Sequence, residues 1–118
     1  MKSIARDSRY HRLFAQKAAN EAKRVLPIFE KENPRDKRPR RAIEAIRGWS
    51  KGRLKLGMRE VRKLSLDAHA ASRGAKSDAA AFAARAAGHA VATWHVPTHA
   101  MAVPYYAAKA IFTRDRAS

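Results

Sequence analysis

The sequence predicts an all-α protein, a compact bundle of about five helices that forms a single domain over residues 1–118. Three observations support this fold class. Apolar residues recur at three- and four-residue steps through most of the chain, which is the spacing of one helix face. No segment alternates apolar and polar residues as a half-buried strand does. Short breaks containing Pro, Gly or Asn separate the periodic segments, and short connections favour antiparallel helix neighbours.

The first helix is predicted over residues 7–29, with Asp7 or Ser8 as its cap. The side chains expected to form its buried face are Tyr10, Leu13, Phe14, Ala18, Ala22, Val25, Leu26 and Phe29. Pro27 falls inside this pattern, and a proline removes one backbone donor from a helix interior. Regular helix is therefore expected to end near Leu26 or to bend there, before a loop at residues 33–39.

Two further helices are predicted in the middle of the chain. The second runs from about Pro39 to residue 51, and the third covers residues 57–73, where Gly74 is a natural terminator. The buried stripes expected are Ile43, Ile46 and either Trp49 or Ser50 in the second helix, and Met58, Val61, Leu64, Ala68 and Ala71 in the third.

Ser77 is expected to cap a fourth, alanine-rich helix that runs to about residue 95, with Asp78 well placed for the helix dipole. A last helix is predicted over residues 99–113, with Thr98 as its cap and Pro104 either bending it or splitting off its second half. Trp49 and Trp94 each lie near an apolar stripe, so both are expected in the core.

The net charge of +16 is concentrated in the first half of the chain. Residues 1–63 hold 20 basic and 7 acidic side chains, whereas residues 64–118 hold 6 and 3. Such a field attracts nucleic acid, anionic lipid or an acidic protein without choosing among them. The start of the chain is charged and lacks the apolar stretch of a signal peptide, and no segment is typical of a membrane span. We therefore expect a cytoplasmic protein that does not contact membranes.

A basic run around residues 35–55 contains the candidate partner-binding residues, which are Arg35, Asp36, Arg38, Arg40, Arg41 and Arg47. Within it, Arg40, Arg47 and Lys51 fall on roughly one side of a helix. Loops carry contacts more often than buried elements, so residues 33–39 and the turn at 96–99 are the places where contacts are expected. Nucleic-acid binding through this run is the alternative to protein binding, and it predicts affinity that falls steeply with salt.

Four histidines in the second half, His69, His89, His95 and His99, are expected to hydrogen-bond neighbouring helix ends. A metal site formed by His69, His89 and His99 is a second alternative. The spacing argues against a metalloprotease motif, because Pro97 interrupts the segment and Val96 stands where a glutamate is needed. The chain has no cysteine, no phosphate-binding glycine loop and no nucleophile motif. A protein without catalytic activity or cofactor is therefore expected.

Four segments together resemble the Imm-5-like putative immunity protein family. They are RVLPIFE at residues 24–30, NPRDKRPRRAIEA at 33–45 followed by Trp49, AHAA at 68–71, and AAGHAVAT at 86–93 followed by HVPTHA at 95–100. The resemblance spans about residues 10–112. It implies a non-enzymatic protein that binds and neutralises a bacterial toxin by forming a complex. Because this chain is basic, the expected partner is a protein with an acidic surface.

Overall fold

The computed structural model describes residues 7–117. Their elements, in chain order, are α1 (Arg9–Glu32), α2 (Arg38–Ser50), α3 (Met58–Arg73), α4 (Asp78–Ala92), a short 3-10 helix η1 (Pro97–Met101) and α5 (Ala102–Ala117). The described range contains no strand, so the predicted all-α class and the count of five helices are confirmed. Within the same range, no helix is both long and apolar enough to cross a membrane.

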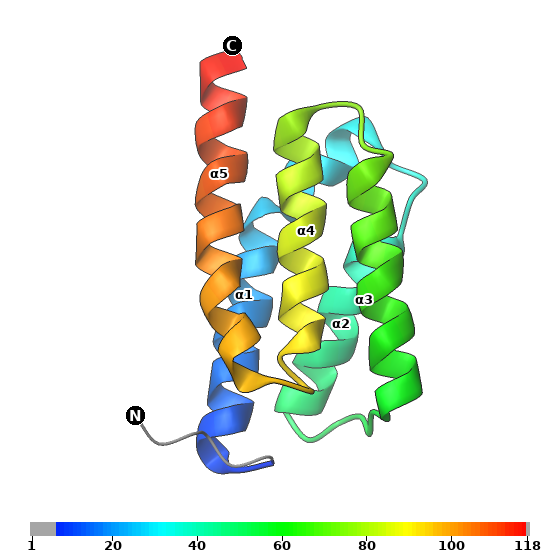
Figure 1. Ribbon diagram of the computed structural model, residues 1–118, viewed down its shortest axis with the longest axis vertical. Helices are drawn as coiled ribbons and strands as arrows, with labels where there is room; N and C mark the ends of the chain where they lie inside the picture. The colour runs from blue at the N-terminus through cyan, green and yellow to red at the C-terminus, as the bar shows by residue number, and fades with distance from the viewer. Residues whose placement is uncertain (1–6, 118) are drawn as a thin grey trace.

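The helices form two layers (Figure 1). Helices α5, α4 and α3 lie side by side in front, and α1 and α2 lie behind them. Chain neighbours α1 and α2, α3 and α4, and α4 and α5 run antiparallel, as the short connections predict. Helix α4 packs against all four of the other α-helices, which makes it the centre of the bundle.

Small side chains allow α4 to occupy this central position. Its buried residues are Ala79, Ala80, Ala83, Ala84, Ala86, Ala87, Gly88, Ala90 and Val91. Residues without large side chains let neighbouring helix backbones approach closely, and the close approach replaces the packing area that larger side chains would supply. Many of the larger core side chains come from α1 and α2, where Val25, Phe29, Ile43, Ile46 and Trp49 are buried.

Helix α1 departs from the prediction in two ways. It continues through Pro27 to Glu32, so the expected end near Leu26 is wrong. Pro27 faces solvent, whereas Leu26, Ile28 and Phe29 around it are buried, and this burial holds the helix together despite the lost donor. The predicted buried face is also wrong at its start. Tyr10 is 68% exposed and Leu13 44% exposed, while the polar His11 is fully buried.

The cap and the end of α4 follow from local chemistry. The Ser77 hydroxyl oxygen accepts the Ala80 N–H at 3.1 Å, which confirms the predicted cap, and the same hydroxyl donates to Glu32 at the end of α1. The helix ends at Ala92, three residues earlier than expected.

The last helix starts later than predicted. Residues 97–101 form η1, and α5 begins at Ala102, so Pro104 lies in the first helical turn. The N–H groups of a first turn have no intrahelical acceptor, so a proline is tolerated there. The prediction that Pro104 bends or splits the helix is therefore wrong. Both tryptophans are buried, which confirms their core assignment.

Candidate functional site

The structure divides the six candidate partner-binding residues into paired and unpaired groups. Asp36 and Arg38 pair with each other: Arg38 donates to both Asp36 carboxylate oxygens, at 2.9 and 2.7 Å. Asp36 also accepts the Arg38 backbone N–H at 3.1 Å, next to the start of α2. The hydrogen bonds from Arg38 lower the pKa of Asp36. This pair holds the helix start in place.

Arg40 is also paired within the chain. Its guanidinium donates to both carboxylate oxygens of Glu30, at 2.8 and 2.6 Å, which ties α2 to α1. These hydrogen bonds lower the pKa of Glu30. Arg35 and Arg41 are exposed and, with Arg47, have no ion-pair partner within residues 7–117. Of the six candidates, three are therefore available cations.

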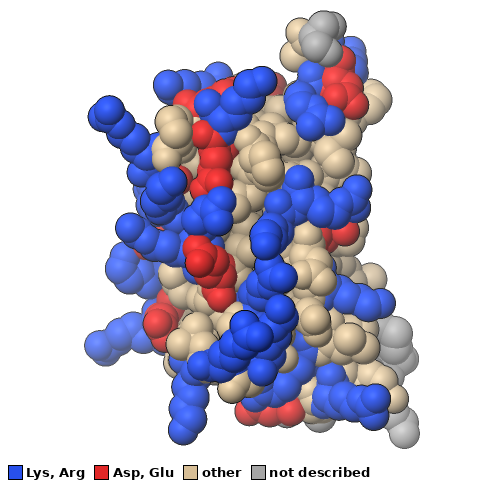
Figure 2. Space-filling view, turned by 180° about the vertical axis from the view of Figure 1, so that it is seen from behind, with Lys and Arg blue, Asp and Glu red and all other residues tan. Residues whose placement is uncertain are grey.

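A groove of about 250 Å³ lies between α1, α2 and the connection that follows α2. We call it the basic groove, and it is lined by Lys23, Leu26, Arg40, Ile43, Glu44, Arg47, Gly48, Lys51 and Arg53. The structure thus brings the predicted trio Arg40, Arg47 and Lys51 to one surface. The basic groove lies on the α1–α2 side of the molecule, where Lys and Arg side chains predominate (Figure 2).

The cations of the basic groove repel one another. The pKa of Lys51 is lowered, with the positive charge of Arg47 as the largest cause and those of Arg53 and Lys23 also contributing. Within residues 7–117, none of these four side chains forms an ion pair. Glu44 is the single carboxylate in the lining. An anion entering the groove would relieve this repulsion.

Lys23 is the cation of the basic groove that the sequence analysis did not identify. The sequence contains a signal that could have identified it. In two antiparallel helices, residues that are equally far from the connecting loop lie side by side. Helix α1 ends at Glu32 and α2 begins at Arg38. Lys23 and Arg47 lie at matching distances from those two ends, so they face each other across the pair.

Three of the four predicted histidines meet at the junction of α3, α4 and η1. We call His69, His89 and His99 the histidine cluster. The ring centroids of His69 and His89 are 5.2 Å apart, and those of His89 and His99 are 5.4 Å apart. The Nδ1 atoms of His89 and His99 are 3.3 Å apart, so one ring donates a hydrogen bond to the other. His95 is exposed and stands outside the cluster.

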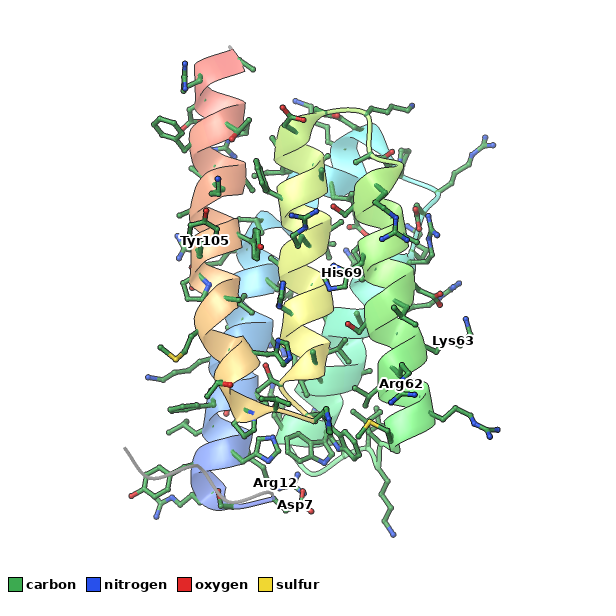
Figure 3. The ribbon with its side chains drawn as sticks, viewed as in Figure 1. Asp7, Arg12, Arg62, Lys63, His69 and Tyr105 are labelled. Atoms are coloured by element: carbon green, nitrogen blue, oxygen red, sulfur yellow. The ribbon has the colours of Figure 1, made fainter. Side chains whose placement is uncertain are left out.

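The histidine cluster packs tightly against the backbone of α4. A side-chain Cβ at Gly88 would lie only 2.7 Å from Nε2 of His69, so the ring occupies the space that the glycine leaves. Figure 3 shows His69 between α3 and α4. On the other side, His89 stacks on Tyr106 of α5, with ring centroids 5.1 Å apart and an angle of 11° between the planes. The cluster thereby connects α3, α4, η1 and α5.

Burial keeps these imidazoles neutral near pH 7. The pKa of His89 is lowered from 6.5 to about 4, mainly by burial and then by the nearby charges of His69 and His99. Burial is also the main cause of the lowered pKa of His69 and of His99. Within residues 7–117, no three His, Asp or Glu side chains are arranged to hold a metal ion. The geometry gives the metal-site alternative no support.

His11 is a histidine that no sequence pattern singles out. Its Nε2 lies 2.7 Å from the Thr93 carbonyl oxygen at the end of α4, and its Nδ1 accepts the Asp7 N–H at 3.0 Å. This network assigns the proton to Nε2. The ring also packs against Trp49 at a centroid distance of 4.8 Å. His11 therefore links α1, α2 and α4.

Arg12 supports the same contact from the surface. It donates to the Trp49 carbonyl oxygen, its guanidinium lies 4.4 Å from the Trp49 ring centroid, and it approaches the Asp7 carboxylate at 3.7 Å (Figure 3).

The fold and its surface define a small all-α protein with an alanine-packed centre and a basic groove. The family model described as Imm-5 like putative immunity protein matches residues 6–117, so the chain belongs to that family. This match confirms the resemblance found in the sequence. No curated protein matches the chain, and no solved structure matches it.

Proposed function

We propose that the protein neutralises a toxin by binding it, without catalysis, through the basic surface of α1 and α2. Family membership supports the general kind of function. The cations of the basic groove support the location, because within residues 7–117 none of Lys23, Arg47, Lys51 and Arg53 forms an ion pair with a carboxylate. The partner surface that complements them is acidic.

The main support for this binding surface is that some arginines of α2 are ion-paired within the chain and others are not. Arg38 and Arg40 are each bound bidentately by a carboxylate of the same chain. Within residues 7–117, Arg41 and Arg47 have no such partner, and of these two only Arg47 lines the basic groove. Charged groups that remain unpaired on a surface steer an oppositely charged partner and raise its association rate.

Co-expression tests this function. Where a toxin-like gene adjoins the gene for this chain, its product is the probe, and a gene neighbourhood without one counts against the proposal. We expect growth to be restored when the two are produced together, and a stable complex of fixed stoichiometry to co-purify. Continued growth arrest at full expression of this chain, with no complex on size-exclusion chromatography, would contradict the proposal.

Nucleic-acid binding is the second candidate, and the same unpaired cations favour it. Titration with duplex DNA and with single-stranded RNA at low and moderate salt tests it. A saturable affinity that falls steeply with salt supports this candidate, whereas an absence of binding at low salt removes it.

A further inference from the structure

The geometry points to the basic groove as the anchor site for one short segment of the protein partner, in which an apolar side chain is flanked by carboxylates. This inference rests on the proposed function and adds the chemistry of the contact. Two properties of the groove carry it: the convergence of cations from separate elements, and an apolar floor between them.

The cations converge from three parts of the chain. Lys23 comes from α1, Arg47 from α2, and Lys51 and Arg53 from the connection that follows. Donors that reach one site from several directions can satisfy more than one carboxylate at once. Arg47 and Arg53 add the planar fork that binds a carboxylate through two hydrogen bonds.

The floor of the groove is apolar. Leu26 and Ile43 line it but are only 3% and 2% exposed, so its accessible apolar surface comes from Gly48 and from the aliphatic stems of the cations. Gly48 lines it as well, and a Cβ at this position would lie 3.3 Å from the Leu54 Cβ. Leu54, which is 42% exposed, fills the space beside the glycine and extends the apolar surface at this edge of the groove. An apolar side chain of the partner gains by covering such a floor, whereas a phosphate or a lone carboxylate does not.

The side chains that line the groove also favour a protein segment over a nucleic acid as the ligand. Single-stranded nucleic acids are held by aromatic side chains on which the bases stack. Among residues 7–117, no aromatic side chain lines the basic groove. A phosphate backbone needs only positive charge, which the wider α1–α2 surface offers equally well, so it has no reason to select the apolar floor.

A pair of synthetic peptides tests the inference directly. The first has a leucine flanked on both sides by glutamates, and the second has glutamines in place of the glutamates. We expect the glutamate peptide to shift the amide resonances of Lys23, Arg47, Lys51 and Arg53 in a saturable way. The glutamine peptide should bind at least about tenfold more weakly, because it lacks the charge. Equal binding of the two peptides would overturn the inference.

Replacing the leucine by serine within the glutamate peptide tests the floor separately. We expect weaker binding by several-fold, since the apolar contact is lost. Unchanged affinity would reduce the groove to a general anion site and contradict the inference. So would a single-stranded oligonucleotide that bound the groove more tightly than the glutamate peptide at the same salt concentration.

Matched charge reversals locate the site. R47E/K51E changes two cations of the groove, and the control R59E/R62E makes the same change in net charge on exposed positions of α3. Arg62 lies on α3, away from the α1–α2 side (Figure 3). We expect about tenfold weaker peptide binding for R47E/K51E and less than about twofold for the control. Equal losses of peptide affinity in the two variants would show that binding depends only on net charge, and would contradict the assignment of the site to the basic groove.

Removing the one carboxylate of the lining provides a gain-of-affinity test. Glu44→Gln is expected to tighten binding of the glutamate peptide, because Glu44 repels the ligand; weaker binding would contradict the assigned ligand charge.

The same variants separate this inference from the proposed function. If the wild-type chain protects against the toxin and R47E/K51E protects equally well at limiting expression, the anchor site is wrong and the function stands. If the wild-type chain neither protects nor forms a complex, the function itself fails, whatever the peptides show.

Discussion

The α1–α2 side and the α4 side of the bundle use different side chains for different tasks. On the α1–α2 side, Lys and Arg predominate, and several of them remain unpaired around the basic groove. On the α4 side, alanine, Gly88 and the histidine cluster fill the contacts among α3, α4, η1 and α5. Exposed charges contribute little to stability, whereas close packing contributes a great deal. We therefore expect variants on the α1–α2 side to change binding, and variants on the α4 side to change stability.

His11→Ala should have the largest effect on stability. It removes a ring that packs against Trp49 and leaves the buried Thr93 carbonyl oxygen without this partner. Cavity formation and the lost hydrogen bond together should cost about 3 kcal/mol of the free energy of unfolding, measured by urea denaturation. The exposed His95→Ala is the control, with an expected change within about 0.5 kcal/mol. Equal effects of the two variants would contradict the structural role of His11.

Gly88→Ala comes next. The new methyl group would collide with the His69 ring, and overpacking should outweigh the better helix propensity of alanine, for a net loss of about 1–2 kcal/mol. The double variant H69A/G88A provides the check. In the His69→Ala background, the same change at position 88 should be neutral or stabilising. A stabilised single variant would show that the ring does not need the glycine.

Acidification should destabilise the α4 side before it affects the carboxylate pairs. The pKa of His89 is lowered in the folded state, so its contribution is complete above pH 6.5 and is lost as the pH falls toward 4. Because His89 is only partly buried, solvent screens its charge, and we expect the free energy of unfolding to fall by about 1 kcal/mol between pH 6.5 and 4.5. Glu30 and Asp36, whose pKa values are also lowered, lose their contributions only at still lower pH.

His89→Phe isolates this histidine. Phenylalanine keeps a ring for stacking on Tyr106 but does not titrate, so the dependence of unfolding on pH in this window should become shallower. An unchanged slope would assign the acid sensitivity to other groups.

Changes on the α1–α2 side should affect stability least. Lys51→Met removes a cation that Arg47, Arg53 and Lys23 repel, so the melting temperature should stay the same or rise slightly. A clear fall in melting temperature would mean that Lys51 stabilises the fold, against the division between the two sides.

Much of the fold could be predicted from local sequence. Ser77 as a cap, Gly74 after α3 and Pro39 in the first turn of α2 each mark a helix boundary through their own backbone chemistry. Pro27 misleads because tertiary burial of its neighbours outweighs one missing hydrogen bond. His11 could not be predicted, since its acceptor lies 82 residues away on α4.

The candidate site could also be predicted only as far as local sequence allows. Helical spacing places Arg40, Arg47 and Lys51 on one side, and the structure brings them to one groove. Helical spacing does not reveal that Arg40 is hydrogen-bonded to Glu30, or that Lys23 of α1 lines the groove. Both contacts depend on how α1 and α2 pack against each other. The sequence also could not separate His95 from the histidine cluster, since the position of η1 decides which imidazoles meet.

The most direct test measures binding and unfolding on the same two variants, R47E/K51E and G88A. The binding measurement uses the glutamate–leucine peptide at a temperature where both variants are folded. We expect R47E/K51E to unfold like the wild type and to bind about tenfold more weakly, and we expect G88A to unfold more readily and to bind like the wild type. Wild-type binding by R47E/K51E, or weakened binding by folded G88A, would contradict the division between a binding side and a packing side.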